Sequence, residues 1–118
     1  MAIAVDPREA YEYVLRADRE APEEERTTFR LRGLPERIER KLLAKMAEDP
    51  LAFAYEALKE ALVGWDNLQD GNGGEHEFKP NKGGGASDAS LDLLHPQWRA
   101  ELAGVIAARG QVSEEEGN

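Results

Sequence analysis

The sequence predicts a small α+β domain, in which an antiparallel β-sheet of two to three strands packs with three to four short helices. Three observations favour this class: two β-leaning segments near the N-terminus, a later change to helical spacing of apolar residues, and glycine-rich breaks between the last segments. At 118 residues the chain has the length of one domain with one modest core. We assign residues 1–110 to this domain and expect 111–118 to be a disordered acidic tail.

The two predicted strands are residues 11–18 and 27–34. The second alternates apolar and charged side chains, as expected of a strand with one buried face. The loop between them, residues 19–26, is too polar to be buried, and we expect the two strands to be antiparallel. A short third strand is expected at 75–79.

After Pro35 the apolar residues take helical spacing, which predicts a first helix at 36–48. Asp49 followed by Pro50 predicts the start of a second helix, because the aspartate can cap free amides and proline loses no hydrogen bond at the first helical position. We expect this second helix to bury one apolar stripe: Leu51, Tyr55, Leu58, Leu62 and Trp65.

The later part of the chain is rich in glycine, and residues 80–87 are predicted to form a flexible linker. A short helix is expected from Ser87, ending before Pro96. A last helix is expected to stop at Gly110, since glycine readily takes the left-handed conformation that ends helices. Its predicted buried face is Trp98, Leu102, Val105 and Ile106.

The chain carries a net charge of −9 and contains no cysteine. Disulfides, thiol nucleophiles and thiolate zinc sites are therefore excluded. An acidic chain without clustered lysine and arginine is not expected to bind nucleic acid directly. Because no secretory pattern and no run of eighteen apolar residues occur, we expect a soluble intracellular protein without a membrane partner.

The stretch 64–78, "GWDNLQDGNGGEHEF", permits three interpretations. A calcium loop starting at Asp66 would place Leu68, which has no side-chain oxygen, at a position that needs a ligand. A phosphate-binding loop would need a Lys-Ser/Thr pair after the glycines and would be opposed by the acidic neighbours. We therefore expect a turn in which Trp65 and Phe78 anchor the two sides in the core.

His76 and His95 are the two histidines and hence the candidate catalytic bases. The serines of the second half do not stand in the sequence context of a nucleophile elbow. Two histidines without cysteine also make a weak set of zinc ligands. We therefore expect no enzymatic activity, no metal and no cofactor.

Four short motifs follow one another along residues 26–108: "FRLRGL", a charged helix, "ALVGWDNLQDGNGGEHEF" and "LDLLHPQWRAELAGVI". This order resembles the tail assembly chaperones of tailed bacteriophages, in which a Gly-Trp-x-Asn-x-x-Asp-x-(x)-Gly phrase is followed by an apolar-Phe return. The glycine-rich segment 81–87 is longer than that pattern leads us to expect. The matching residues here are Gly64, Trp65, Asn67, Asp70, Gly73 or Gly74, and Phe78.

The resemblance implies a protein that works by binding. Tail assembly chaperones keep the helical tape-measure protein soluble in the host bacterial cytoplasm, help to recruit tail-tube subunits, and leave before the virion is finished. Short helices with apolar stripes could present a groove to such a helix, and an acidic surface would keep the complex dispersed. The candidates for partner contacts, each of which could instead belong to the core, are Leu58, Leu62, Trp65, Trp98 and Leu102.

Two other classes of function stay open. One is a head-tail connector or completion protein that remains in the phage particle. The other is an acidic inhibitor of a host defence nucleoprotein of the CRISPR type, acting by nucleic-acid mimicry and sensitive to salt. Mimicry requires carboxylates placed regularly on one rigid face, for which the candidates are Asp66, Asp70, Glu75, Glu77, Asp88 and Asp92.

Overall fold

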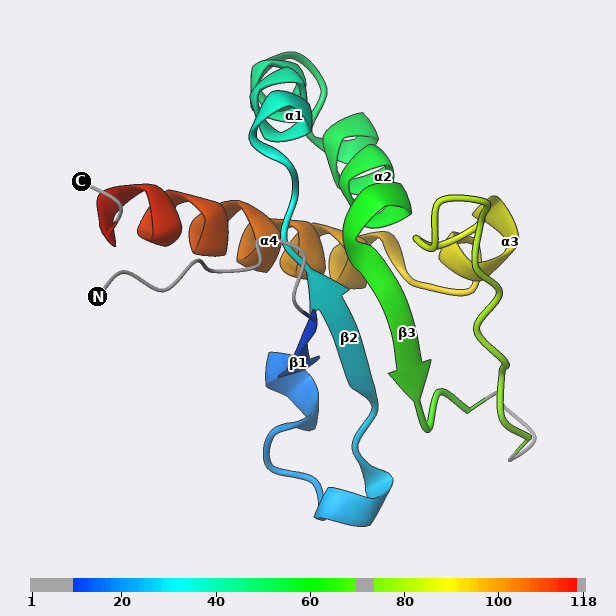
Figure 1. Cartoon of the computed structure of the whole chain (residues 1–118). Coiled ribbons are helices and arrows are strands. Elements are labelled where there is room, and N and C mark those ends of the chain that lie inside the picture. Colours follow the sequence, from blue (N-terminus) through cyan, green and yellow to red (C-terminus); the bar gives the residue numbers. More distant parts are fainter. Residues whose placement is uncertain (1–9, 70–73, 117–118) are drawn as a thin grey trace, which may run out of the picture.

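A three-stranded antiparallel sheet in the order β1-β2-β3 forms one side of the molecule, as the predicted α+β class requires (Figure 1). The computed structural model describes residues 10–69 and 74–116. Within them the strands are β1 (Ala10–Val14), β2 (Thr28–Arg32) and β3 (Leu62–Asp66). The helices are α1 (Glu36–Glu48), α2 (Pro50–Ala61), α3 (Asp88–Leu91) and α4 (Pro96–Glu116).

The central strand β2 confirms the alternation seen in the sequence. Phe29 and Leu31 are fully buried, whereas the arginines between and after them lie on the other face of the sheet. Phe29 is opposite Tyr13 of β1 on one side and Trp65 of β3 on the other. One face of the sheet is thereby apolar and packs against the helices.

The first predicted strand is shorter than expected. Strand β1 ends at Val14, and the remainder of the predicted segment forms a 3₁₀ turn, Arg16–Asp18. A second 3₁₀ turn, Glu23–Glu25, lies in the charged loop before β2. The antiparallel pairing of β1 with β2 is as predicted.

The second predicted helix is wrong at its end. Asp49 does cap α2 by accepting a hydrogen bond from the Ala52 amide at 3.2 Å, but the helix ends at Ala61. Leu62 and Trp65 lie on β3 instead, where the ladder with β2 satisfies their backbone groups. Leu51, the first member of the expected stripe, is 67% exposed.

A shift in the register between β2 and β3 explains why Leu62 and Trp65 have helical spacing although they lie on a strand. Two strand residues three apart normally point to opposite faces, yet Leu62 and Trp65 are both buried. Leu31 pairs with Leu62 and Arg30 pairs with Gly64, which leaves Val63 as an extra residue in β3. This bulge turns both apolar side chains toward the core, so the spacing fits a bulged strand as well as a helix.

The glycine-rich segment predicted as a linker is instead tied to the end of α2. The Asn81 side chain donates to the carbonyl oxygens of Lys59 at 2.9 Å and of Ala86 at 3.0 Å. Arg32 donates to the Glu60 carbonyl at 2.9 Å and to the Gly83 carbonyl at 2.8 Å. The last carbonyls of α2 thus receive hydrogen bonds from β2 and from the turn around residue 83.

The third strand predicted at 75–79 does not form. Only isolated bridges occur around it among the described residues, Gln69 with Glu75 and Pro80 with Ala86. The backbone groups of this segment find other partners: the N–H and the carbonyl of Lys79 both bond to the Ser90 hydroxyl at 2.8 Å. The Ser90 side chain therefore forms the hydrogen bonds that we expected a neighbouring strand to form.

Helix α3 begins as predicted, with the Ser87 hydroxyl accepting from the Ser90 amide. Helix α4 does not stop at Gly110 but continues to Glu116. Glycine can take the left-handed conformation that ends a helix, but it can equally take the helical conformation, so the helix can continue through it. Residues 111–116 of the tail predicted as disordered therefore belong to this helix.

The core has two parts. The larger lies between the sheet, the end of α2, α3 and α4. The smaller lies between α1, α2 and α4; of these, α1 and α2 stand beyond the upper end of the sheet in Figure 1. Leu34, at the join of β2 and α1, packs against both parts. No helix within residues 10–69 and 74–116 has the length and apolar character needed to cross a membrane.

Replacing Trp65 with alanine should lower the free energy of unfolding by about 3–5 kcal/mol, because the ring is 4% exposed and its removal leaves a cavity. Urea unfolding followed by circular dichroism measures this loss. Trp98→Ala, at a half-buried position, is the matched control and should cost less. An unchanged melting temperature in Trp65→Ala would contradict this placement of the ring.

Gly85 and Gly104 should respond in opposite ways to alanine. A Cβ at Gly85 would lie 1.8 Å from the Lys59 carbonyl oxygen, so Gly85→Ala must displace backbone and should destabilise the fold by about 1–3 kcal/mol. A Cβ at Gly104, within α4, meets nothing within 4 Å, so Gly104→Ala should stabilise it by about 0.5–1 kcal/mol. The same urea titrations compare the two; equal effects would show that the turn is not packed on α2.

Candidate functional site

The residues expected to contact a partner mostly hold the core. Leu58, Leu62 and Leu102 are 0% exposed and Trp65 is nearly so. Trp98, half-buried near the start of α4, is the one member of the five that reaches the surface. Four of the five predicted contacts are thus unavailable in this conformation, which is the alternative that the sequence left open.

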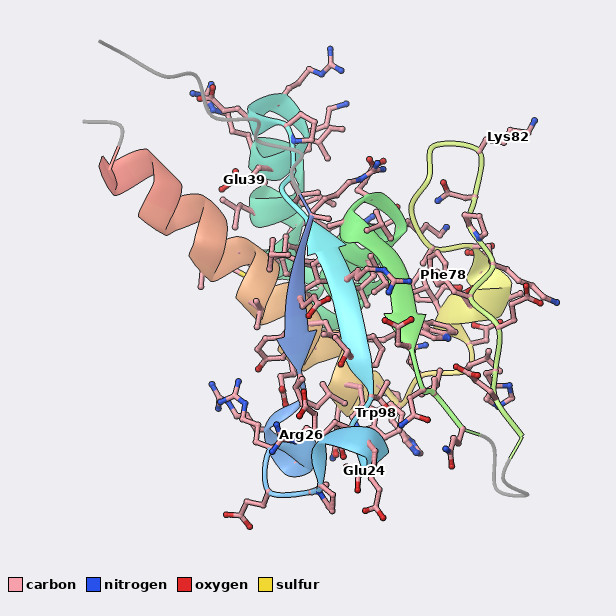
Figure 2. The ribbon with its side chains drawn as sticks, turned by 60° about the horizontal axis from the view of Figure 1, so that its bottom comes forward. Glu24, Arg26, Glu39, Phe78, Lys82 and Trp98 are labelled. Carbon is pink, nitrogen blue, oxygen red and sulfur yellow. The ribbon has the colours of Figure 1, made fainter. Side chains whose placement is uncertain are left out.

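The Trp65 ring joins the sheet to the loop that returns after residue 74. It makes edge-to-face contacts with Phe29, at 6.3 Å between ring centroids, and with Phe78, at 5.0 Å. Its indole N–H donates to the His76 carbonyl at 2.8 Å. Figure 2 shows Phe78 on the segment between β3 and α3. Both predicted anchors of the turn, Trp65 and Phe78, therefore meet in the core.

Asn67 directly follows β3 and forms hydrogen bonds to two other segments of the chain. Its φ of 63° lies in the left-handed region, which asparagine tolerates better than most residues. The side-chain amide donates to the carbonyls of Glu24 and Arg26, and the backbone N–H donates to the Glu75 carboxylate. Figure 2 shows Glu24 and Arg26 together at the far end of the sheet. Asn67 thus connects the loop before β2 with the segment after β3.

Gly64 leaves room for an arginine across the sheet. A Cβ there would lie 2.6 Å from the Arg30 guanidinium, which forms an ion pair with Asp66 at 2.6 Å. Any larger residue at this position would have to displace that pair. Gly64, Trp65, Asn67 and Phe78 of the matching phrase thus each have a structural role, whereas Asp70 and Gly73 lie outside the described residues.

An open cavity of about 340 Å³ lies beside Trp65 and is lined by Glu75, His76, Glu77 and Phe78. Much of its lining is engaged elsewhere: Glu75 accepts from the Asn67 amide, and His76 uses both backbone groups, donating to the Leu68 carbonyl and accepting from Trp65. In the part of the chain that is described, no group of three or more histidine, aspartate or glutamate side chains is placed to hold a metal.

His95, the second candidate base, directly precedes helix α4. Its carbonyl oxygen accepts the N–H groups of Trp98 and Arg99 at 3.0 and 3.1 Å. Its ring meets the Trp98 ring edge-on at 4.6 Å. The two histidines therefore lie in separate parts of the fold, one beside β3 and the other at the start of α4.

The acidic candidates divide into two groups. Asp66 and Glu75 lie at the end of β3, where Arg30 and the Asn67 amide bind them, and Glu77 is exposed nearby. Asp88 and Asp92 lie on and after α3, and Asp70 falls outside the described residues. The described carboxylates include several that are already paired.

Tyr55 connects the second acidic group to α2. Its hydroxyl bonds to the carboxylates of Asp88 at 3.1 Å and Asp92 at 3.4 Å, and its ring lies against Lys59 and Arg99. Burial, followed by the hydrogen bond to Asp88, raises the pKa of Tyr55 to about 12. Hydrogen bonds from Lys59 and Tyr55 lower the pKa of Asp88, and the bond to Asp88 raises the pKa of Lys59.

Exposed apolar side chains occur where the sequence did not predict contacts. Among the residues whose burial is described, the large ones are Met46, Leu51 and Leu93. The sequence predicts buried side chains from helical spacing alone. That spacing includes Leu51 in the buried stripe, but in the structure Leu51 lies outside it. Helix α1 also exposes cations, for which the sequence predicted no role.

Comparisons with protein-family models, with curated proteins and with solved structures find no match.

Titration of Tyr55 should weaken the fold only in alkali. Its folded-state pKa lies above the unfolded value near 10, so its contribution to stability is fully present below pH 10 and is lost as pH rises through about 12. Asp88→Asn removes the charged acceptor and should move the late phenol titration, followed by ultraviolet absorbance, toward lower pH. Tyr55→Phe should abolish that late step; an unchanged titration in Asp88→Asn would contradict the assignment.

Proposed function

We propose that this protein is a non-catalytic assembly protein of a tailed bacteriophage, acting as a tail assembly chaperone. In this proposal it binds the tape-measure protein, the tail-tube protein or both in the host bacterial cytoplasm. It leaves before the particle is complete.

The observation that carries the proposal is the packing of the matching phrase. Gly64, Trp65, Asn67 and Phe78 together join the sheet, the charged loop and the return segment. Residues with such roles constrain a fold, so a chain that shares them is expected to share the architecture. The motif therefore supports common architecture with tail assembly chaperones, and their binding function follows as the proposal.

The burial of four candidate residues changes where a partner would bind. A partner helix must use side chains that are already at the surface, and these include Trp98 and the exposed apolar residues of α1 and α2. Binding at the surface also requires no opening of the core. The proposal therefore places the partner on the helices and not between the sheet and α2.

Nucleic-acid mimicry is less well supported. A mimic presents carboxylates that a basic groove can neutralise, but Asp66 is paired with Arg30 and Asp88 with Lys59. Breaking these pairs would oppose binding. A connector that stays in the particle has no such conflict and differs from a chaperone in where the chain ends up.

A tagged pull-down from phage-producing cells, at low and at moderate salt, tests the proposal. We expect a long helical tape-measure or tail-tube protein in the eluate, and we expect mature virions to lack this chain. Presence of the chain in virions would favour a connector. Recovery of a basic host nucleoprotein that is lost as salt rises would contradict the chaperone and favour mimicry.

A further inference from the structure

Helix α1 carries a row of cations on its exposed side. Arg37, Lys41 and Lys45 are spaced four residues apart and are all exposed, so they follow one line along the helix over about 12 Å. No ion pair joins any of the three to another described residue. The neighbouring Arg40 differs, because it pairs with Glu36 at 2.6 Å.

This arrangement is unfavourable for the isolated helix. Like charges four residues apart repel each other and destabilise a helix, whereas a glutamate at the central position would form attractive pairs. The chain as a whole carries −9, so anionic side chains are common elsewhere. A concentrated row of positive charge that has no ion pair to another described residue, on an acidic protein, is suited to an anionic ligand.

Small and apolar side chains lie beside the row. Ala44 and Ala47 are exposed, and by helical geometry they lie between the cations and the half-buried Leu43. Arg40, paired with Glu36, lies between the two alanines on the helix surface, and Met46 lies on the far side of Leu43. The outer face of α1 thus offers a place for close helix contact bordered on one side by positive charge.

We propose that the outer face of α1 is the docking site for an acidic amphipathic helix of a partner protein. Its carboxylates would lie opposite Arg37, Lys41 and Lys45, and its apolar side chains would cover Ala44 and Ala47. This deepens the proposed function, on which it rests for the existence of a protein partner. It adds the chemistry of the partner segment and the face that binds it.

A protein helix fits this face better than nucleic acid does. A phosphate backbone would gain the three cations but would leave the alanines uncovered, and it would meet the same acidic protein and the same exposed Glu48 as a carboxylate-bearing helix. An acidic helix gains the same charges and also covers the alanines. Both the charge and the small side chains of the face are then used.

The test uses a synthetic amphipathic peptide of ~21 residues with leucine along one stripe and glutamate on both flanks. Its affinity for the full chain is measured by fluorescence anisotropy, beside a matched peptide with lysine in place of every glutamate. We expect the glutamate peptide to bind, more weakly as salt rises, and the lysine peptide not to bind. Equal binding of both peptides, or none by the glutamate peptide, would overturn the proposal.

Lys41→Glu separates binding from folding. The substituted carboxylate lies four residues from both Arg37 and Lys45, so the unfolding midpoint should stay the same or rise, while peptide affinity falls about fivefold. Lys82→Glu changes the net charge equally but lies on the turn after residue 80, where Lys82 projects from the molecule (Figure 2). It should leave affinity unchanged; equal losses in both variants would overturn the proposal.

Two further measurements separate this inference from the proposed function. A single-stranded oligonucleotide that binds wild type and loses affinity in Lys41→Glu would show that the row binds nucleic acid, which overturns the inference. In the phage pull-down, equal recovery of a tape-measure protein by wild type and Lys41→Glu would overturn the inference and support the function. Recovery of no phage protein by wild type would instead contradict the function, while the peptide still decides the inference.

Discussion

The direct join of α2 to β3 is the constraint on which the rest of the structure depends. The helix ends at Ala61 and the strand begins at Leu62, so no loop residues are available to satisfy the last helical carbonyls. Distant donors do so instead: Arg32 from β2 and Asn81 from the glycine-rich turn. The turn can come this close because Gly85 has no side chain. One helix end thereby fixes the sheet, the turn and the position of α3 after it.

Local signals in the sequence predicted the elements whose causes are local. Strand β2 followed from alternation and the start of α2 from the Asp49 cap, and the structure confirms both. The end of α2 could not be predicted in this way, because the spacing of Leu62 and Trp65 fits a helix and a bulged strand equally. The glycine-rich segment was misjudged because its partners, the carbonyls of α2, are more than twenty residues away in sequence.

The candidate site shows the same division. Apolar spacing identified residues that pack, but it did not distinguish packing against the core from packing against a partner; Leu58 and Leu102 turned out to be core. The motif that suggested a phage protein consists, where it is described, of residues that build the fold. The cation row of α1 is visible in the sequence, yet its significance depends on the absence of ion pairs with other described residues, which only the folded arrangement shows.

Amide hydrogen exchange in the native protein tests the central claim most directly. If the end of α2 organises the fold, the amides of its last turn and of β2 and β3 should exchange through one opening, with a free energy close to that of global unfolding. Rapid exchange in the last turn of α2, with β2 and β3 still fully protected, would contradict the claim that the sheet depends on this helix end.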